Sequence, residues 1–342
     1  MTEQPPILVT GASGYIALHV MRQLLDAGNA VRGTLRSLDR EAELREVLGV
    51  SASSQQLEFV TADLTADAGW DAAVTGCALV VHTASPVPMS KPKHEDDLIV
   101  PAREGALRLL RAARAAGVRR VVMTSSVAAV GAGGQREEGR RYSEADWSNV
   151  DGDIDAYSKS KTLAERAAWE FVAGQPEDRR MELVTINPSL VLGPNLARDH
   201  SPSVEAVRKL LAREVPGCPR LGWSFVDVRD VAAAHVAALT APEAAGHRYI
   251  CSGGFHWMSD IADMLAGHLA PMGRKVPTRR LPDFVVRLVA LFDPTVRMVA
   301  SDLGRRSEFD TAAIRRDLGW EPRPIAQTVS DTADSLIAHG VA

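Results

Sequence analysis

The sequence has little of what marks exported, membrane-spanning or nucleic-acid-binding proteins. It has three cysteines, which are far apart and lack metal-ligand spacing: Cys77, Cys218 and Cys251. No apolar run approaches the roughly 20 residues of a membrane span, and the first residues carry neither a basic start nor an apolar signal core. The net charge of −4 and the scattered arginine doublets do not favour nucleic acid. We therefore expect a cytoplasmic protein without a membrane or nucleic-acid partner.

The histidines do not form a metal-binding pattern. Six of them share no ligand spacing, and none belongs to an HExxH sequence: His82, His94, His200, His235, His247 and His256. Ordinary core or surface positions explain them, so we expect no metal. Aromatic residues make up only 5% of the chain. A few of these aromatic residues could line a pocket, although core packing favours most of them: Trp223, Phe225, Phe255 and Trp257.

What the sequence does contain is a regular alternation of short apolar runs and helical patterns. Strands are predicted at 7–10, 30–35, 57–60, 79–83, 120–124 and 182–187, and helices at 15–27, 41–48, 98–116 and 155–172. The strands are rich in Val, Ile and Leu without polar alternation, which is typical of a parallel sheet covered on both faces. We therefore expect an α/β protein with a doubly wound parallel sheet.

The first strand runs into a turn of small residues, Thr10-Gly11-Ala12-Ser13-Gly14-Tyr15-Ile16-Ala17. Small residues at 11, 14 and 17 suit a backbone that approaches a pyrophosphate, which the N–H groups of the following helix can bind. A plain tight turn is the alternative, but the position between strand and helix favours a Rossmann-type dinucleotide site. Ala17 replaces the usual third glycine, where a methyl group is tolerable. Cofactor contacts are expected from Gly11, Ser13, Gly14, Tyr15 and Ile16.

The end of the second strand indicates which dinucleotide binds. An NAD site usually has an acidic residue there to accept hydrogen bonds from the ribose 2′-hydroxyl. This chain instead has Arg36, with Arg40 one turn further on. A guanidinium group suits a 2′-phosphate, which it can bind with two hydrogen bonds. We therefore predict NADPH, the alternative being that both arginines are exposed surface residues.

The pattern becomes less regular after about residue 190, with Pro and Gly at 193–194, 216–219 and 271–273. This favours a smaller lobe at the carboxyl ends of the strands, where an open α/β sheet binds its ligands. We divide the chain into an NADP-binding Rossmann domain, 1–190, with a return segment near 222–252, and a mainly substrate-binding lobe, 191–342. Asp230 is placed to cap the helix that follows it.

A hydroxyl, a phenol and an ammonium group form the candidate catalytic set. Tyr157 and Lys161 are four residues apart on a predicted helix, so they share a face. A free phenol has a pKa near 10, which a nearby ammonium group lowers. A pair on the helix surface is the alternative. The strand ending in Ser126, however, would bring a hydroxyl to the sheet edge where the nicotinamide should lie.

Several segments together resemble the extended short-chain dehydrogenase/reductase superfamily: TGASGYIA, ADL (62–64), HTASP (82–86), TSS (124–126), YSKSK and INPSLVLGP (186–194). The segments HTASP, AYSKSKTLAERAAWEF (156–171) and FVDVRDVAAAH (225–235) are similar to its dihydroflavonol-4-reductase-like branch, and most to microbial methylglyoxal and aldehyde reductases. The resemblance implies an NADPH-dependent oxidoreductase acting on CH–OH and carbonyl groups. It would reduce small aldehydes or ketones, reversibly, as a monomer or homodimer.

The resemblance also implies a role for each matching residue. Ser126 would hydrogen-bond the substrate carbonyl, and Tyr157 would donate a proton to its oxygen. Lys161 would hold the nicotinamide ribose and lower the tyrosine pKa. Donors aimed at the developing negative charge on that oxygen should supply the main stabilisation. Further cofactor contacts are implied at the adenine by Asp63 and Leu64, and at the nicotinamide half by Thr83, Ser85, Pro188 and Ser203.

The sequence departs from the family in two places, the first of which concerns the proton relay and the second the choice of substrate. The helix 96–116 has no asparagine to complete a proton relay, so water or a backbone carbonyl must do that work, or the relay differs. Plant flavonoid reductases place an asparagine where this chain has Gly131, which favours a small apolar or aromatic carbonyl compound instead. We expect the pocket to be formed by Pro86–Met89, Val127–Val130 and the lobe after Gly193.

Two other functions stay open. A dehydratase would carry an acidic pair after Ser126, where Val127 and Ala128 stand, and an epimerase normally keeps NAD bound, against which Arg36 argues. A non-catalytic NADP-binding sensor would usually have lost the tyrosine. The carbonyl reductase therefore remains the favoured function.

Overall fold

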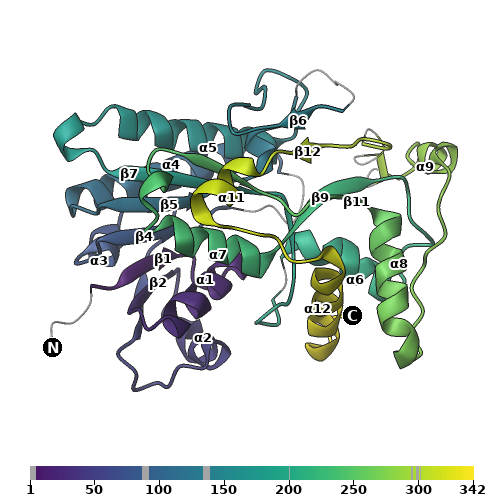
Figure 1. Cartoon of the computed structure of the whole chain (residues 1–342), viewed down its shortest axis with the longest axis horizontal. Coiled ribbons are helices and arrows are strands. Elements are labelled where there is room, and N and C mark those ends of the chain that lie inside the picture. The colour runs from purple at the N-terminus through teal and green to yellow at the C-terminus, as the bar shows by residue number, and fades with distance from the viewer. Residues whose placement is uncertain are drawn as a thin grey trace.

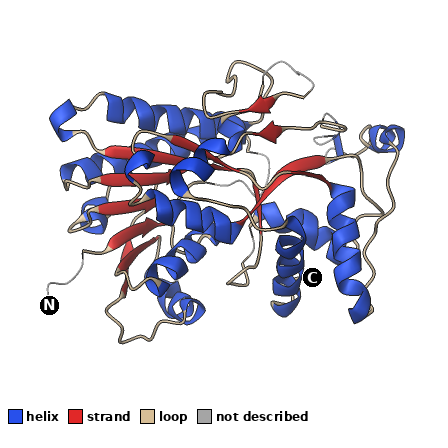
Figure 2. Ribbon diagram, viewed as in Figure 1, coloured by secondary structure: helices blue, strands red, loops and turns tan. Residues whose placement is uncertain are grey.

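The computed structural model describes residues 5–86, 92–133, 139–199, 201–293, 296–297, 300 and 302–342. Across these residues the main sheet has seven parallel strands in the order β10-β7-β5-β4-β1-β2-β3 (Figures 1 and 2). In chain order they are β1 (Ile7–Thr10), β2 (Val31–Leu35), β3 (Leu57–Thr61), β4 (Leu79–His82), β5 (Arg120–Thr124), β7 (Glu182–Pro188) and β10 (Arg248–Cys251). The parallel sheet is as predicted.

The strands are central because their side chains are apolar on both faces. Every residue of β5 is buried, as is every residue of β7 after Glu182. Such strands need cover on both sides. One face packs against α1 (Tyr15–Asp26), α2 (Glu41–Leu48), α7 (Val228–Ala238) and α11 (Ala312–Leu318). The other packs against α3 (Trp70–Val74), α4 (Asp96–Ala115) and α5 (Ala156–Ala173). This doubly wound arrangement confirms the predicted fold class.

A smaller lobe lies beside the carboxyl ends of the strands (Figure 1). It contains a sheet in the order β11-β9-β8, formed by β8 (Leu190–Leu192), β9 (Gly222–Asp227) and β11 (Phe255–Trp257). Around its own apolar core pack α6 (Glu205–Leu211), α8 (Met258–Leu269) and α12 (Ile325–Ala338), while α9 (Asp283–Val289) lies further out. A parallel pair, β6 (Arg141–Tyr142) and β12 (Glu308–Phe309), joins distant parts of the chain.

The predicted return segment is split between the two parts. Strand β9 pairs within the small sheet, whereas α7 and β10 pack on or in the main sheet. The predicted helix cap at Asp230 is wrong. Asp227 is the N-cap of α7 and accepts a hydrogen bond from the N–H of Arg229, because the helix begins three residues earlier than expected. Asp230 lies in the first turn and binds the Arg323 guanidinium at 2.7 Å.

The described residues include neither a membrane-spanning helix nor a metal-binding cluster. No helix in these ranges combines the length and apolarity that spanning a bilayer requires. They also hold no group of three or more His, Cys, Asp or Glu side chains that could ligate a metal ion. His82 and His235 instead lie in the core, where they hydrogen-bond Thr10 and Thr124 at 2.8 and 2.7 Å.

Candidate active site

A cavity of about 1300 Å³ lies between the carboxyl ends of the main strands and the lobe. It brings together nearly all of the predicted site residues although they come from widely separated segments. Its walls include Gly11, Ser13, Gly14, Tyr15, Ile16, Arg36, Asp63, Leu64, Thr83, Ser85, Ser126, Tyr157, Lys161, Pro188 and Ser203. Of the predicted catalytic and cofactor-binding residues, all of which the structure describes, Arg40 does not line it, and its guanidinium pairs with Glu43 and Asp199 at 2.8 and 2.7 Å.

The glycine turn packs closely against the segment that follows β4. Gly11 has a φ of +67°, which favours glycine, and a Cβ there would lie 3.0 Å from the Cα of Ala84. Gly14 is the N-cap of α1, and among the described residues no side chain caps this helix. Its first N–H groups are therefore available to an anion in the cavity. Ala17 is fully buried where the third glycine would stand, so its methyl group is accommodated.

Arg36 and Asp63 lie near each other at the other side of this turn. Both line the cavity, at the end of β2 and just after β3. Hydrogen bonds from Thr65 hold the pKa of Asp63 below its ordinary value, and Arg36 adds to this effect. A cation at the end of β2 and an anchored carboxylate beside it suit the phosphorylated adenosine end of a dinucleotide.

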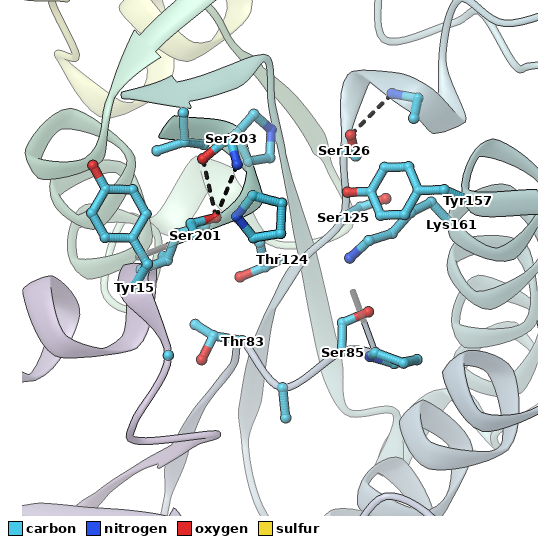
Figure 3. Close-up of a pocket in the computed structure, with 18 of the residues that line it drawn as sticks. Tyr15, Thr83, Ser85, Thr124, Ser125, Ser126, Tyr157, Lys161, Ser201 and Ser203 are labelled. Atoms are coloured by element: carbon cyan, nitrogen blue, oxygen red, sulfur yellow. Dashed lines mark hydrogen bonds between the residues drawn. The ribbon is translucent and has the colours of Figure 1, made fainter. Parts of the chain in front are cut away.

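Tyr15 lines the cavity, but its hydroxyl is hydrogen-bonded within the protein. Its O–H donates to the carbonyl of Gly193 at 2.7 Å, and Figure 3 shows the hydroxyl pointing away from Tyr157 and Lys161. The tyrosine therefore connects α1 to the lobe, and it lines the cavity together with Ser13 and Ile16.

The candidate catalytic set converges in the middle of the cavity. Tyr157 and Lys161 project from α5, and Ser126 lies beside the tyrosine ring (Figure 3). The Ser126 hydroxyl accepts a hydrogen bond from the N–H of Ala128 at 3.1 Å. Asp155 caps α5 by accepting from the N–H of Ser158 at 3.0 Å, which places Tyr157 in the first helical turn. The three side chains form a compact polar centre.

Burial dominates the acid–base properties of this centre. It raises the pKa of Tyr157 above its ordinary value, with the hydrogen bond from Ser126 acting against the shift. The expected lowering by Lys161 therefore does not decide the pKa in this structure. Burial also lowers the pKa of Lys161 to about 8, opposed by the negative charge of Glu165. At neutral pH the phenol keeps its proton and most of the lysine is charged, so Tyr157 can act as a proton donor.

The far end of the cavity has walls that sequence reasoning found only in part. Val127 and Ala128 line it as expected, but Ala129 and Val130 point into the core. Pro86 also lines the cavity, whereas Val87–Met89 lie outside the described residues. The residues that were missed come mainly from the lobe and from a segment near the C-terminus: Ser189, Leu190, Gly222, Ser224, Asp302, Arg305, Ser307 and Phe309. Ser189 and Leu190 lie within the segment INPSLVLGP, whereas the others carry no motif and only the folded chain brings them here.

The aromatic candidates separate into two groups. Trp223 lines the cavity, whereas Phe225 is buried in the lobe core. Phe255 and Trp257 pack on each other edge to face and do not line the cavity. Phe309 takes their place, held against Tyr142 by the pairing of β12 with β6.

Comparison with known proteins agrees with this geometry. Residues 7–252 match the NAD dependent epimerase/dehydratase family. An uncharacterized oxidoreductase of Saccharomyces cerevisiae is 33% identical over 97% of each chain. Cinnamoyl-CoA reductase 1 of Petunia hybrida is 36% identical over 98% of this chain and 92% of its own.

Among solved structures, the yeast methylglyoxal/isovaleraldehyde reductase Gre2, complexed with NADPH, superposes with a TM-score of 0.81. It is 27% identical and covers 98% of this chain and all of its own. The parallel sheet, the glycine turn and the Ser126–Tyr157–Lys161 centre thus occur in a chain with relatives along nearly its whole length. The protein belongs to the NAD dependent epimerase/dehydratase family and, within it, to the extended short-chain dehydrogenases/reductases that its motifs predict.

Proposed function

We propose that this protein is an NADPH-dependent reductase of small aldehydes or ketones. The observation that carries the proposal is one cavity that holds both a dinucleotide cradle and a proton-donating centre. The glycine turn and Arg36 line one part of it, and Ser126, Tyr157 and Lys161 line another. The relatives of this chain also support carbonyl reduction, because they include cinnamoyl-CoA reductases and an aldehyde reductase whose structure contains NADPH.

The residues of the cavity fit NADPH. A side chain at position 11 would crowd Ala84 and strain a backbone of positive φ, so a glycine stands there. Among the described residues no side chain caps the start of α1, which suits a pyrophosphate. Arg36 supplies the cation for a 2′-phosphate, and the stretch 31–36 contains no carboxylate that would select NADH. Thr83, Ser85, Pro188 and Ser203 would border the nicotinamide half.

The chemistry divides among three side chains. When bound, NADPH supplies the hydride that the carbonyl carbon accepts. The Ser126 hydroxyl would donate a hydrogen bond to the carbonyl oxygen and hold it beside Tyr157. Tyr157 would deliver its proton to that oxygen as negative charge develops there. The Lys161 ammonium would bind the nicotinamide ribose hydroxyls and stabilise the tyrosinate that remains.

The substrate end favours compounds that are largely apolar around the carbonyl. Val127, Ala128, Trp223 and Phe309 supply apolar wall, and Gly131 stands where a flavonoid reductase would present an asparagine. Such a wall fits short aliphatic or aromatic aldehydes and ketones. Reversibility, a cytoplasmic location and a monomeric or homodimeric state stay predictions from the sequence.

The test is a panel of aldehydes, ketones, alcohols and nucleotide-sugars, assayed by nicotinamide absorbance with both cofactors. We expect NADPH oxidation with small aldehydes or ketones and slower oxidation of NADH. Conversion of a nucleotide-sugar without net change in the cofactor would instead establish an epimerase. NADPH binding without turnover of any compound would favour a non-catalytic sensor.

A further inference from the structure

A buried carboxylate lies one helical turn beyond Lys161 on the catalytic helix. The side chain of Glu165 is 0% exposed and extends the series formed by Tyr157 and Lys161 at spacings of four residues. Sequence reasoning did not single it out, because an acidic residue in a helix is most often on the surface. A buried carboxylate needs partners that offset the loss of hydration.

Glu165 accepts hydrogen bonds from three neighbouring strands. Ser125 at the end of β5 donates its hydroxyl at 2.5 Å, and Asn187 of β7 donates its amide at 2.8 Å. Thr185 of β7 donates at 3.0 Å, and the guanidinium of Arg248 in β10 forms an ion pair at 2.6 Å. The catalytic helix is therefore fixed to the sheet edge at the point where the candidate active site begins.

The same contacts fix the backbone of Ser126. Ser125 is its chain neighbour, and the amide of Asn187 donates to the carbonyl of Ser126 at 3.2 Å as well as to Glu165. A shift of the carboxylate would therefore move both groups that hold this serine. The alignment of the Ser126 hydroxyl with Tyr157 depends on it, because one comes from β5 and the other from α5.

Arg248 extends the connection to the substrate wall. Its guanidinium donates to the carbonyls of Glu144 and Asp146 and stacks 3.7 Å from the centre of the Trp147 ring. Ser148, the next residue, donates to the carbonyl of Ala128 at 2.7 Å. The ion pair therefore supports the same wall segment that follows Ser126.

Glu165 is also the carboxylate that acts on Lys161. On its own helix Lys161 is flanked by Tyr157 and Glu165, and from β4 it faces His82, whose pKa burial lowers to about 3. The two β7 residues that contact Glu165, Thr185 and Asn187, are not ionisable. Arg248 of β10 is paired with Glu165. From α4, Asp97 lines the same cavity and accepts from the N–H of His94. A negative charge beside a buried ammonium group favours its protonated form.

We propose that Glu165 is a positioning residue of the active site, which with Arg248 and Asn187 holds Ser126 in place and keeps Lys161 charged. The inference rests on the proposed function, since it concerns the same centre. It adds residues that touch neither substrate nor cofactor and act through those that do. Their substitution should change the pH dependence of turnover as well as its size.

The experiment compares Glu165→Gln, which keeps the shape and removes the charge, with the double variant Glu165→Gln/Arg248→Met. The double variant leaves no unpaired buried guanidinium, so it keeps the test valid if the single variant does not fold. The matched control is Glu182→Gln. Glu182 pairs with Arg120 at 2.6 Å at the opposite, amino-terminal ends of β7 and β5, away from the cavity.

For folded variants we expect kcat at pH 7 to fall by roughly ten-fold and its high-pH decline to move about one pH unit lower, because Lys161 loses the charge that keeps it protonated. At pH 6 the Kd for NADPH should change little. The control should keep the wild-type kcat and pH profile. A reduced melting temperature with an unmoved pH profile and near-normal kcat would overturn the proposal and leave only a structural role.

A second measurement distinguishes failure of the Glu165 proposal from failure of the proposed reductase function. NADPH fluorescence measures cofactor affinity against pH without any substrate and reports on the same lysine. If the wild-type protein reduces no carbonyl compound but the affinity profile moves in Glu165→Gln, the reductase proposal fails and the Glu165–Lys161 coupling stands. An unmoved affinity profile, in that case, overturns the coupling as well.

Discussion

The ammonium nitrogen of Lys161 lies 5.9 Å from the centre of the Tyr157 ring, and on the same face of α5 the lysine is buried and the tyrosine half-buried. Burial disfavours charge on either group, so it raises the pKa of the phenol and lowers that of the ammonium. The two pKa values therefore move in opposite directions, which leaves the pKa of the lysine below that of the phenol. A protonated phenol and a lysine that titrates just above neutral pH follow from this one relationship.

Replacing Tyr157 with Phe removes the proton donor and keeps the ring packed. We expect kcat for carbonyl reduction to fall by roughly 10²–10⁴-fold, the value of a positioned acid, while the Kd for NADPH stays within a few-fold of wild type. Steady-state kinetics beside fluorescence titration would measure both. The control is Tyr249→Phe, which removes a hydroxyl bound to Glu243 and Asp317 outside the cavity and should leave turnover unchanged. Near-normal turnover in Tyr157→Phe would place the acid elsewhere.

Replacing Arg36 with Ala should weaken NADPH binding by about 1.5–3 kcal/mol, the value of a hydrogen bond to a charged group. NADH has no 2′-phosphate, so its affinity should hardly change. Arg40→Ala is a close control, because that arginine is one turn away but pairs with Glu43 and Asp199 instead of lining the cavity. Calorimetric titration with both cofactors decides the matter. Equal losses for NADPH and NADH would contradict the role of Arg36.

Turnover should decline as the pH rises through the pKa of Lys161, which burial lowers to about 8. The sign follows from the charge: below that pH the ammonium group is present, and above it the neutral amine no longer stabilises a tyrosinate. Tyr157 stays protonated over this range because its own pKa is raised. Lys161→Arg keeps a positive charge at all these pH values, so its residual activity should lose the decline. A decline that persists in the arginine variant would have to come from another group.

Enlarging Val127 to Phe should change which substrates are reduced. The side chain lines the cavity next to Ser126 and away from the glycine turn, so bulky ketones should lose kcat/KM more than small aldehydes. The affinity for NADPH should not change. Val130→Ala is the comparison, since Val130 is buried in the core and should affect stability without reordering the substrates. A changed NADPH affinity with the substrate order intact would place the pocket elsewhere.

The main sheet could be predicted from the sequence because its strands are continuous apolar runs. The predicted bounds of β5 are the same as those in the structure, and the predicted bounds of α2 also agree with the structure. The lobe could not be predicted in the same way. Strands β8 and β11 have three residues each and β12 has two, which is too short for any periodicity to emerge. Their positions depend on contacts between distant segments.

The candidate active site likewise combines residues that local patterns predict with residues that only the folded chain brings together. The glycine turn and the Tyr157–Lys161 pair are local patterns, and the sequence alone predicts them. Asp227 and Asp230 are three residues apart and chemically alike, so only the folded helix shows that the first caps it while the second binds Arg323. Glu165 pairs with Arg248, which is 83 residues away in the sequence. No local pattern in the helix indicates that pairing.

The segment from Asp302 to Phe309 forms part of the cavity wall yet contributes to none of the buried contacts that hold Tyr157 and Lys161 in place. Arg305, at its centre, is exposed and pairs with Asp302 across a single turn of chain. Mutations of its cavity-lining residues should therefore alter the cavity wall without disturbing the catalytic helix or the main sheet. This makes the segment a suitable first target for redesigning substrate preference, because libraries built there should retain folded, cofactor-binding protein at high frequency.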